Sequence, residues 1–433
     1  MKEKNPTHGS YATGDLGEIK EKVLNWLPQF STFCFLDNHQ YQLPGHSEEC
    51  LVAAGVKRTI KYEPGVLDAL DIFTREKKSW LFGHLGYDLK NEIENLSSSH
   101  PDGIGFSPLF FFEPAIVLKI SAGTISIEAD DPDAVFAAIR QTAIENEHSP
   151  AKYTSIQSRL SKNEYVAIIK KLQQHILRGD CYEINYCQEF FAGQTAINPV
   201  DVFQQLSTAS PNPFAALYRL DNQWLLCASP ERYLQKKGNR ILSQPIKGTA
   251  ARDLLHEEQD KINKAALLHS EKDRSENVMV VDLVRNDLSK VCEEGTVKVD
   301  ELFGIYSFPQ VHQMISTISG ELKTGASFSD IIKASFPMGS MTGAPKKRVM
   351  ELIEQYEKTK RGIFSGAVGY ISPDGDFDFN VVIRSIMYNA ATDYLSFQAG
   401  SAITFYSDPE KEWEECLLKA AVLKKVLNDT AAL

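Results

Sequence analysis

Residues 223–249 read QWLLCASPERYLQKKGNRILSQPIKGT, a stretch that predicts a run of antiparallel strands. Apolar and β-branched segments alternate here with turn signals, which is the pattern of short strands joined by tight turns. A Lys-Gly-Asn turn at 237–239 is typical of a β-hairpin. The predicted strands are 223–228, 232–236 and 241–246.

The register of this hairpin brings two ionisable residues to its open end. If the turn centres on Gly238 and Asn239, residues whose numbers sum to 477 or 478 face each other. Glu231 then lies opposite Ile246 or Lys247, so a carboxyl and an amine share one end of the hairpin. The alternative is an exposed cross-strand ion pair, and the spacing taken alone favours that alternative.

Two further segments carry acidic residues at helical spacing. Asp273 and Glu276 are three residues apart, as are Glu412 and Glu415 far downstream, so each pair lies on one face of its predicted helix. If the two faces met, their oxygens would suit Mg²⁺, a hard cation that keeps several of its waters. Two solvated helix faces are the alternative interpretation.

Strand and helix patterns are mixed along the chain, which predicts an α+β, or complex α/β, fold. A capping box begun by Ser161 starts an amphipathic helix over 162–178. The front of the chain is predicted to consist of short strands followed by a helix over 135–147. The polar stretch 145–152 is a predicted linker, which divides the chain into regions 1–150 and 151–433.

Composition excludes several classes of protein. The 433 residues include 46 basic and 57 acidic side chains, a net charge of −11, which argues against broad nucleic-acid binding. No apolar run approaches the roughly 20 residues of a membrane span, and the first residues lack the apolar stretch of a signal peptide. Seven cysteines without a C-x-x-C pair fit reduced thiols. We therefore expect a cytoplasmic protein that binds neither nucleic acid nor membrane.

Several ordered motifs in the second half of the chain resemble one known family. The matching segments are Gly179 to Asn185, Ser229-Pro230-Glu231, Pro245 to Thr249, Asp273 to Asp287, Phe336 to Lys346, Ser365 to Tyr370, Val382-Ile383-Arg384 and Asp408 to Lys419. Together they resemble the chorismate-utilising enzymes, which include anthranilate, aminodeoxychorismate and isochorismate synthases. The resemblance implies an anthranilate synthase component I-like fold, with two packed antiparallel sheets and helices outside.

One residue discriminates within this family. Anthranilate synthases have alanine where this chain has Lys247, and a lysine there resembles the large subunits of aminodeoxychorismate synthases. The resemblance implies a transferase that makes 4-amino-4-deoxychorismate from chorismate and ammonia, for para-aminobenzoate and folate synthesis. Lys247 would be the nucleophile and must be neutral; Glu231 would be the general acid/base and must start protonated. The ammonia would come from a separate glutamine amidotransferase subunit.

The same resemblance implies a set of binding residues. Glu276 and Glu415 would hold Mg²⁺ most directly, with Asp273 and Glu412 acting through water. Arg384, at the end of a predicted strand 381–383, would grip a substrate carboxylate. The remaining predicted substrate contacts are Thr249, Gly400, Ser401, Phe364 and Gln313.

The chain also departs from the family pattern. Many relatives have Gln where this chain has Glu183, or Lys in isochorismate formers, and the absence of Lys argues against water as the nucleophile. Gln313 stands where relatives have a catalytic histidine, and Phe364 where an aromatic with a hydrogen-bonding group is common. Two alternatives remain: an anthranilate synthase component I, and a catalytically silent regulatory or binding subunit.

Overall fold

The computed structural model describes residues 7–42, 45, 48–144 and 155–427. These residues form twenty strands and eleven α-helices, and all the strands belong to one hydrogen-bonded network. Neighbouring strands are antiparallel throughout the described pairs, as in β2–β9 and β8–β20. The predicted α+β class is confirmed.

The strands divide into two layers that share one long strand, β5 (Leu109–Ser121). The first layer leaves one edge of β5 and runs, in spatial order, through β3 (Cys50–Lys61), β2 (Thr32–Asp37), β9 (Phe214–Leu220), β10 (Gln223–Ser229), β19 (Ser385–Asn389), β20 (Tyr394–Ile403) and β8 (Glu183–Ala192). Strands β6 (Thr124–Ala129), β1 (Thr7–Ala12), β7 (Gln157–Ser158) and β16 (Gly343–Ala344) extend its ends.

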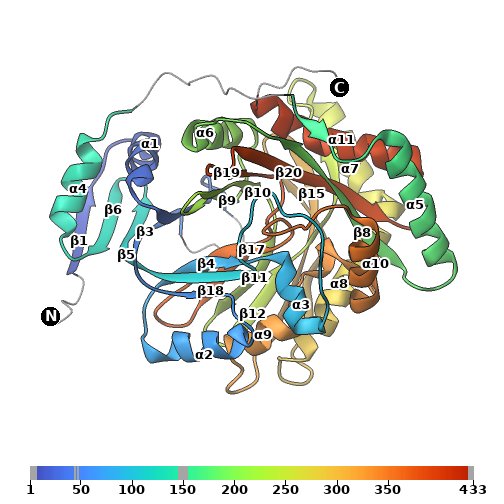
Figure 1. The fold of residues 1–433 in the computed structure, drawn as a ribbon, viewed down its shortest axis with the longest axis horizontal. Coiled ribbons are helices and arrows are strands. Elements are labelled where there is room, and N and C mark those ends of the chain that lie inside the picture. Colours follow the sequence, from blue (N-terminus) through green and yellow to red (C-terminus); the bar gives the residue numbers. More distant parts are fainter. Residues whose placement is uncertain (1–6, 43–44, 46–47, 145–154, 428–433) are drawn as a thin grey trace.

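The second layer leaves the opposite edge of β5, and Figure 1 labels most of its strands below β9, β10 and β19 of the first layer. Its order is β4 (Leu81–Leu85), β17 (Ala367–Ile371), β18 (Phe377–Asn380), β11 (Arg232–Lys237), β12 (Arg240–Gln244) and β15 (Val311–Glu321). The strands β13 (Ile246–Ala251) and β14 (Lys298–Ser307) also pair with β15.

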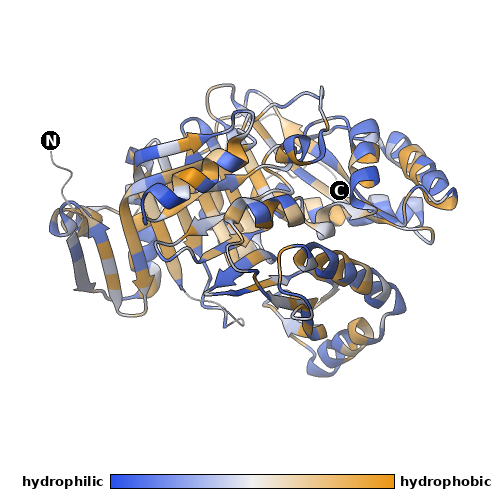
Figure 2. Ribbon diagram, turned by 90° about the horizontal axis from the view of Figure 1, so that it is seen from below, coloured by the Kyte–Doolittle hydropathy of each residue, from blue (hydrophilic) through white to orange (hydrophobic). Residues whose placement is uncertain are grey.

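Alternation along the strands explains why the layers pack. In β10, Leu225 and Cys227 face the core shared with Leu234 and Phe379 of the second layer, whereas Leu226 lies in a second core on the other face. Successive side chains of a strand point to opposite faces, so a fully apolar strand must be covered on both sides. Figure 2 shows the apolar colouring concentrated in these strands.

Helices provide the outer cover (Figure 1). Those that pack on the first layer contribute apolar residues to the second core: α1 (Leu16–Trp26), α5 (Lys162–Leu177), α6 (Pro199–Ala209), α10 (Lys346–Tyr356) and α11 (Pro409–Val426). Those on the second layer are α2 (Val66–Glu76), α8 (Glu271–Ser289) and α9 (Phe328–Ser335), with α7 (Glu257–His269) against β13. The remaining helices are α3 (Lys90–Glu94) and α4 (Pro132–Gln141). The arrangement of two packed antiparallel layers with helices outside matches the expectation.

Several local predictions are confirmed and others are wrong. The capping box forms, since the Ser161 hydroxyl accepts from the amide of Glu164 and the Glu164 carboxylate accepts from the amide of Ser161. The helix expected over 135–147 is instead α4, which begins at Pro132 and ends at Gln141, with Asp131 as its cap. The linker expected at 145–152 lies outside the described residues.

The front of the chain shares hydrogen bonds with the rest. β2 pairs with β9 and β4 pairs with β17, so strands from before residue 150 are interior members of both layers. The division at residue 150 stays a prediction about the chain.

The described residues include no helix that is both long and apolar enough to traverse a bilayer. All seven cysteines are buried and none forms a disulfide.

Candidate active site

The hairpin has the predicted register near its turn but not at its open end. Lys237 faces Arg240, as expected, whereas a bulge after Arg232 shifts the pairing so that Arg232 faces Gln244. The third strand was expected to run to residue 246, but it ends at Gln244, and Pro245, which has no amide to donate, separates it from β13. Lys247 therefore lies within a strand that pairs with β15, not at a strand end.

Glu231 is buried in the loop between β10 and β11 and has the character of an acid. It is 4% exposed, and this burial raises the pKa of its carboxyl to about 7. The polar groups of Ser340 and Ile246 and the charge of Lys247 act against this rise without cancelling it. A carboxyl with such a pKa is partly protonated at neutral pH, as the predicted general acid must be.

Lys247 is buried close enough to Glu231 to feel its charge, and it forms an ion pair. Its Nζ donates to Oε1 of Glu183, the first residue of β8, at 2.9 Å. Burial by itself lowers the pKa of Lys247, but the carboxylates of Glu183, Glu276 and Glu231 outweigh it and hold that pKa above its ordinary value. The expectation of a neutral Lys247 is therefore not met in this structure, because three acidic groups face one amine.

The two acidic helices approach each other near Lys247. Lys272, on α8, lies between them, with its Nζ 3.9 Å from Oε1 of Glu276 and 4.0 Å from Oε1 of Glu412 on α11. Asp273 lies against Gly248, whose added Cβ would be 3.0 Å from Cβ of Asp273. Glu415, also on α11, pairs with Lys419 at 2.7 Å and acts electrostatically on Lys247. The helices thus place their predicted acidic faces beside Lys247, the predicted nucleophile.

The donor chemistry of these faces fits Mg²⁺. Among the described residues, no three acidic, histidine or cysteine side chains converge on a point that would hold a metal ion. Mg²⁺, however, is commonly bound by one or two carboxylates, with water and substrate supplying the other ligands. Burial raises the pKa of Glu276 to about 7, and the nearby charges of Lys247 and Lys272 offset this effect only in part. The ligand set stays a prediction.

Arg384 follows β18 but does not end it. β18 ends at Asn380, so the strand expected over 381–383 is absent, and Val381 instead donates from its amide to the carbonyl of Glu231. Arg384 has a φ of 52°, in the left-handed region that is uncommon for residues other than glycine. Within the described residues its guanidinium forms no ion pair, although it interacts electrostatically with Glu415. A half-buried, unpaired arginine is suited to an anionic ligand.

Four other predicted contacts lie on the strands β13, β15 and β20. Gly400 and Ser401 are in β20, where the Ser401 hydroxyl donates to Glu412 and the Gly400 carbonyl accepts from Lys419 at 2.9 Å. Thr249, on β13, pairs with Gln313 on β15. The Oε1 atom of buried Gln313 has no hydrogen-bond partner among the described residues.

Phe364 is buried beside the β17 segment, and its amide donates to the carbonyl of Arg361. Its part in a substrate pocket stays a prediction.

Sequence reasoning missed two partners of this site. Glu183 was noted only as a departure from the family pattern, although it is the group in hydrogen-bond contact with Lys247. Lys272 was not considered, although it lies four residues before Glu276 and so on the same helix face. The i, i+4 spacing of Lys272 and Glu276 is a sequence signal from which their contact could have been predicted. No sequence signal indicates that Glu183 on β8 meets Lys247 on β13.

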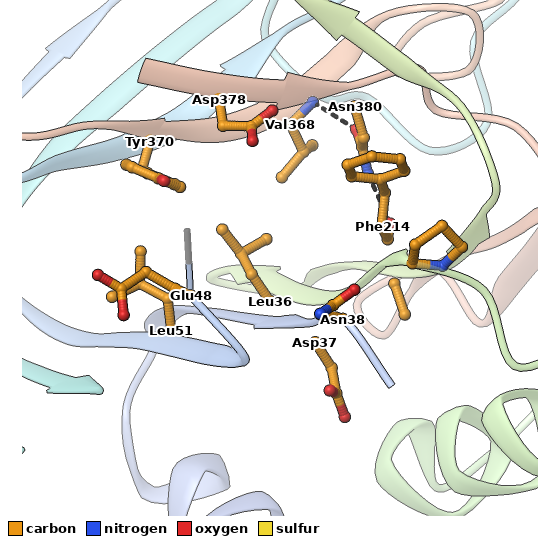
Figure 3. Close-up of a pocket in the computed structure, with 12 residues that line it drawn as sticks. Leu36, Asp37, Asn38, Glu48, Leu51, Phe214, Val368, Tyr370, Asp378 and Asn380 are labelled. Carbon is orange, nitrogen blue, oxygen red and sulfur yellow. Dashed lines mark hydrogen bonds between the residues drawn. The ribbon is translucent and has the colours of Figure 1, made fainter. Parts of the chain in front are cut away.

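A separate hollow lies between the front strands and the second layer (Figure 3). Its polar side chains are largely engaged: Asn380 accepts from the amide of Val368 and donates to the carbonyl of Phe214, each at 3.0 Å. Asp378 accepts from Arg232 at 2.9 Å. None of the lining residues belongs to the predicted site.

Comparison with known proteins identifies relatives of the whole arrangement. Residues 35–425 match a family model described as chorismate binding enzyme. Aminodeoxychorismate synthase component 1 of Escherichia coli (strain K12) is 32% identical over 395 residues, 88% of this chain and 86% of that protein. A probable chloroplastic aminodeoxychorismate synthase of Oryza sativa subsp. japonica is 42% identical over 272 residues, 62% of this chain. The chain spans 30% of the length of that plant protein.

Among solved structures, anthranilate synthase component I from Streptococcus pneumoniae TIGR4 has a TM-score of 0.77 at 25% identity. The match covers 90% of this chain and 94% of that chain. The expected fold is confirmed.

Proposed function

Because the chain belongs to the family of chorismate binding enzymes, we propose that it aminates chorismate, giving 4-amino-4-deoxychorismate for para-aminobenzoate and folate synthesis. The observation that carries this proposal is Lys247, a buried amine that is held by Glu183 and lies within electrostatic reach of buried Glu231. Relatives named aminodeoxychorismate synthase component 1 support it, since they match most of the chain. We propose that the reaction takes place in the cytoplasm, where buried thiols stay reduced.

The covalent route divides one difficult substitution into two easier ones. Lys247, once neutral, attacks ring carbon 2 of chorismate, while Glu231 gives its proton to the 4-hydroxyl, which leaves as water. Ammonia then bonds to carbon 4 and the bond between Lys247 and carbon 2 breaks. The pKa of about 7 suits Glu231 to this task, because the carboxyl both holds and releases a proton near neutral pH.

The substrate is a dianion, and the site around it is acidic. We propose that Arg384 binds one carboxylate, with Thr249, Gly400, Ser401, Gln313 and Phe364 lining the pocket. Glu276 and Glu415 would hold Mg²⁺, with Asp273 and Glu412 reaching it through water. When bound, the ion supplies positive charge for the second carboxylate. The buried, poorly compensated Glu276 supports this placement.

We also propose a glutamine amidotransferase subunit as the partner that supplies ammonia. The words "component 1" in the names of the bacterial relatives support a second component. The chain's own cysteines are all buried, and burial raises the pKa of each thiol, so none has the exposed thiolate character of a glutamine-hydrolysing nucleophile.

The test is direct. The purified chain is incubated with chorismate, Mg²⁺ and an ammonium salt, and the product is identified by mass, with and without Lys247→Ala. We expect an aminated product that keeps its enolpyruvyl group, loss of turnover by at least 10²-fold in Lys247→Ala, and loss of turnover when EDTA removes the metal.

Other outcomes assign other functions. Anthranilate as the main product contradicts the role of Lys247 and identifies an anthranilate synthase. Absence of turnover with folded protein favours a silent binding or regulatory subunit.

A further inference from the structure

The Lys247–Glu183 ion pair joins the two layers at the candidate site. Lys247 belongs to β13 of the second layer and Glu183 begins β8 of the first. Their side chains are 10% and 3% exposed, and 2.9 Å separates Nζ from Oε1. The backbone of Glu183 is held closely as well, because Ala344 pairs with it and a Cβ on Gly343 would lie 2.1 Å from its carbonyl oxygen. The carboxyl group is therefore aimed at Lys247 by a rigid strand.

The second oxygen of Glu183 is unsatisfied. Oε2 is buried and has no hydrogen-bond partner among the described residues. An ionised carboxylate accepts up to about four hydrogen bonds, and a buried charge that lacks them is costly. A neutral carboxylic acid in the same place loses much less by burial. Oε2 of Glu183 is thus a buried acceptor atom without a hydrogen-bond partner, on the same carboxylate that contacts Lys247.

Other acids near Lys247 have different tasks. Glu231 has to keep its proton for the departing hydroxyl, and Glu276 and Glu415 face it from α8 and α11 as predicted metal ligands. Of these carboxylates, Glu183 alone forms a hydrogen bond with Nζ in the described structure. A proton leaving Lys247 has the shortest path to Glu183.

We propose that Glu183 is a catalytic residue that takes the proton of Lys247 and so makes this amine a nucleophile. The inference rests on the proposed chorismate amination. An N–H bond of Lys247 breaks and an O–H bond forms on Glu183, and the freed electron pair forms the N–C bond to ring carbon 2. The C4–O bond breaks, and the hydroxyl leaves as water with the proton from Glu231.

The protons return in the second half of the cycle. As ammonia bonds to carbon 4, the N–C bond of Lys247 breaks and the amine is regenerated with its electron pair. Glu183 gives its proton back to Lys247, and the new ammonium group gives one proton to Glu231. The sum is chorismate plus ammonia giving 4-amino-4-deoxychorismate plus water, with every enzyme group restored.

The experiment compares Glu183→Gln with the unaltered chain. Glutamine keeps an acceptor for Lys247 but cannot take its proton. Formation of the covalent adduct on Lys247 is followed by intact mass in a single turnover with chorismate and without ammonia, and complete turnover is followed with ammonium. We expect the adduct to form on the order of 10²-fold more slowly in the variant at neutral pH.

The pH profile separates this role from a structural one. Solvent must remove the proton in Glu183→Gln, so the ratio of variant to unaltered rate should rise about tenfold per pH unit. Glu183→Asp keeps a carboxylate, so the ratio of its rate to that of the unaltered chain should not change with pH, although its rate should be lower. Glu189→Gln is the matched control: Glu189 is a buried carboxylate of the same strand, paired with Arg159 at 2.6 Å.

Two results overturn the proposal. An adduct rate in Glu183→Gln equal to that of the unaltered chain, or reduced by the same factor at every pH, shows that Glu183 only positions Lys247 or only supports the fold. If the unaltered chain forms neither adduct nor product from chorismate, the proposed function fails and this inference fails with it. If the unaltered chain turns over chorismate normally but the ratio of variant to unaltered rate does not change with pH, only the role of Glu183 is overturned.

Discussion

We assign different proton transfers to two carboxyls, Glu231 and Glu183, and their surroundings in the structure differ. Glu231 is enclosed by protein, and burial raises its pKa to about 7. Glu183 contacts a cation directly, so its charge is balanced by Lys247. Pairs of ionisable groups whose environments separate their protonation are a common basis for acid and base roles in one site.

The state of Glu231 predicts the pH dependence of the first chemical step. The proposed acid must be protonated, so adduct formation by the unaltered chain should be constant below about pH 7 and fall about tenfold per unit above it. Glu231→Gln should be slower by on the order of 10²-fold and lose this decline. Single-turnover rates without ammonia measure the step, because the supply of free ammonia itself changes with pH. A decline that persists in the variant assigns the titration to another group.

At the scale of elements, the contact of β20 with β8 positions one wall of the site. Gly400 faces Cys187, and a Cβ on Gly400 would lie 1.9 Å from the carbonyl oxygen of Tyr186 and 2.6 Å from Cα of Cys187. These are backbone atoms, which cannot rotate away. Glycine is therefore required for the two strands to pair here, and the adjoining Ser401 is placed by the same pairing.

Gly400→Ala should open this strand pair. We expect a loss of about 1–3 kcal/mol in the free energy of unfolding, together with a larger fall in chorismate turnover than the stability loss explains. Gly14→Ala is the control, because a Cβ there meets nothing within 4 Å, and it should change stability by no more than about 0.5 kcal/mol. Urea unfolding measures the stability of the two variants. Equal losses of stability in Gly400→Ala and Gly14→Ala would contradict the packing argument.

At the scale of the whole molecule, buried polar contacts join the layers as well as apolar ones. His84, on β4 of the second layer, accepts from the hydroxyl of Tyr218 on β9 of the first layer, with Nδ1 3.1 Å away. Its Nε2 donates to the carbonyl of Ser107 at 2.7 Å. Both nitrogens are used by a neutral ring, and burial lowers the pKa of His84 to about 4.

Protonation of His84 should weaken the junction of the layers. Its pKa is lower in the folded chain than the ordinary 6.5, so its contribution is complete above pH 6.5 and is lost as the pH falls toward 4. The loss amounts to about 3 kcal/mol at most, from 1.4 kcal/mol per unit. Glu231 acts in the opposite sense: its raised pKa gives stability at low pH that is lost as the pH rises through about 7.

The measurement is therefore a difference. The free energy of unfolding of the unaltered chain minus that of His84→Gln should shrink as the pH is lowered from 7 toward 4, while the contribution of Glu231 cancels. A difference that is independent of pH would show that His84 titrates normally in the folded chain.

Part of the acidic excess behind the net charge of −11 is concentrated at the candidate site. Five carboxylates from β8, α8 and α11 gather around two lysines, Lys247 and Lys272: Glu183, Asp273, Glu276, Glu412 and Glu415. The carboxylates outnumber these lysines and would repel a dianionic substrate, which is the physical reason to expect a metal there together with Arg384.

The sequence by itself determined the features that depend on near neighbours. Capping at Ser161, the faces of α8 and α11 and the turn at Gly238 follow from spacings of two to four residues. The motifs also sufficed to identify the family. Such features depend on residues that are close together in the sequence, so the sequence alone is enough to predict them.

The tertiary structure alone decided which distant groups meet. Pro245 divides the expected third strand, so Lys247 belongs to β13 and faces β8, a strand more than sixty residues earlier. The pKa of Lys247 follows from that meeting, since carboxylates from three other elements outweigh its burial. Electrostatic energy depends on separation in space and on burial, and neither can be read from separation along the chain.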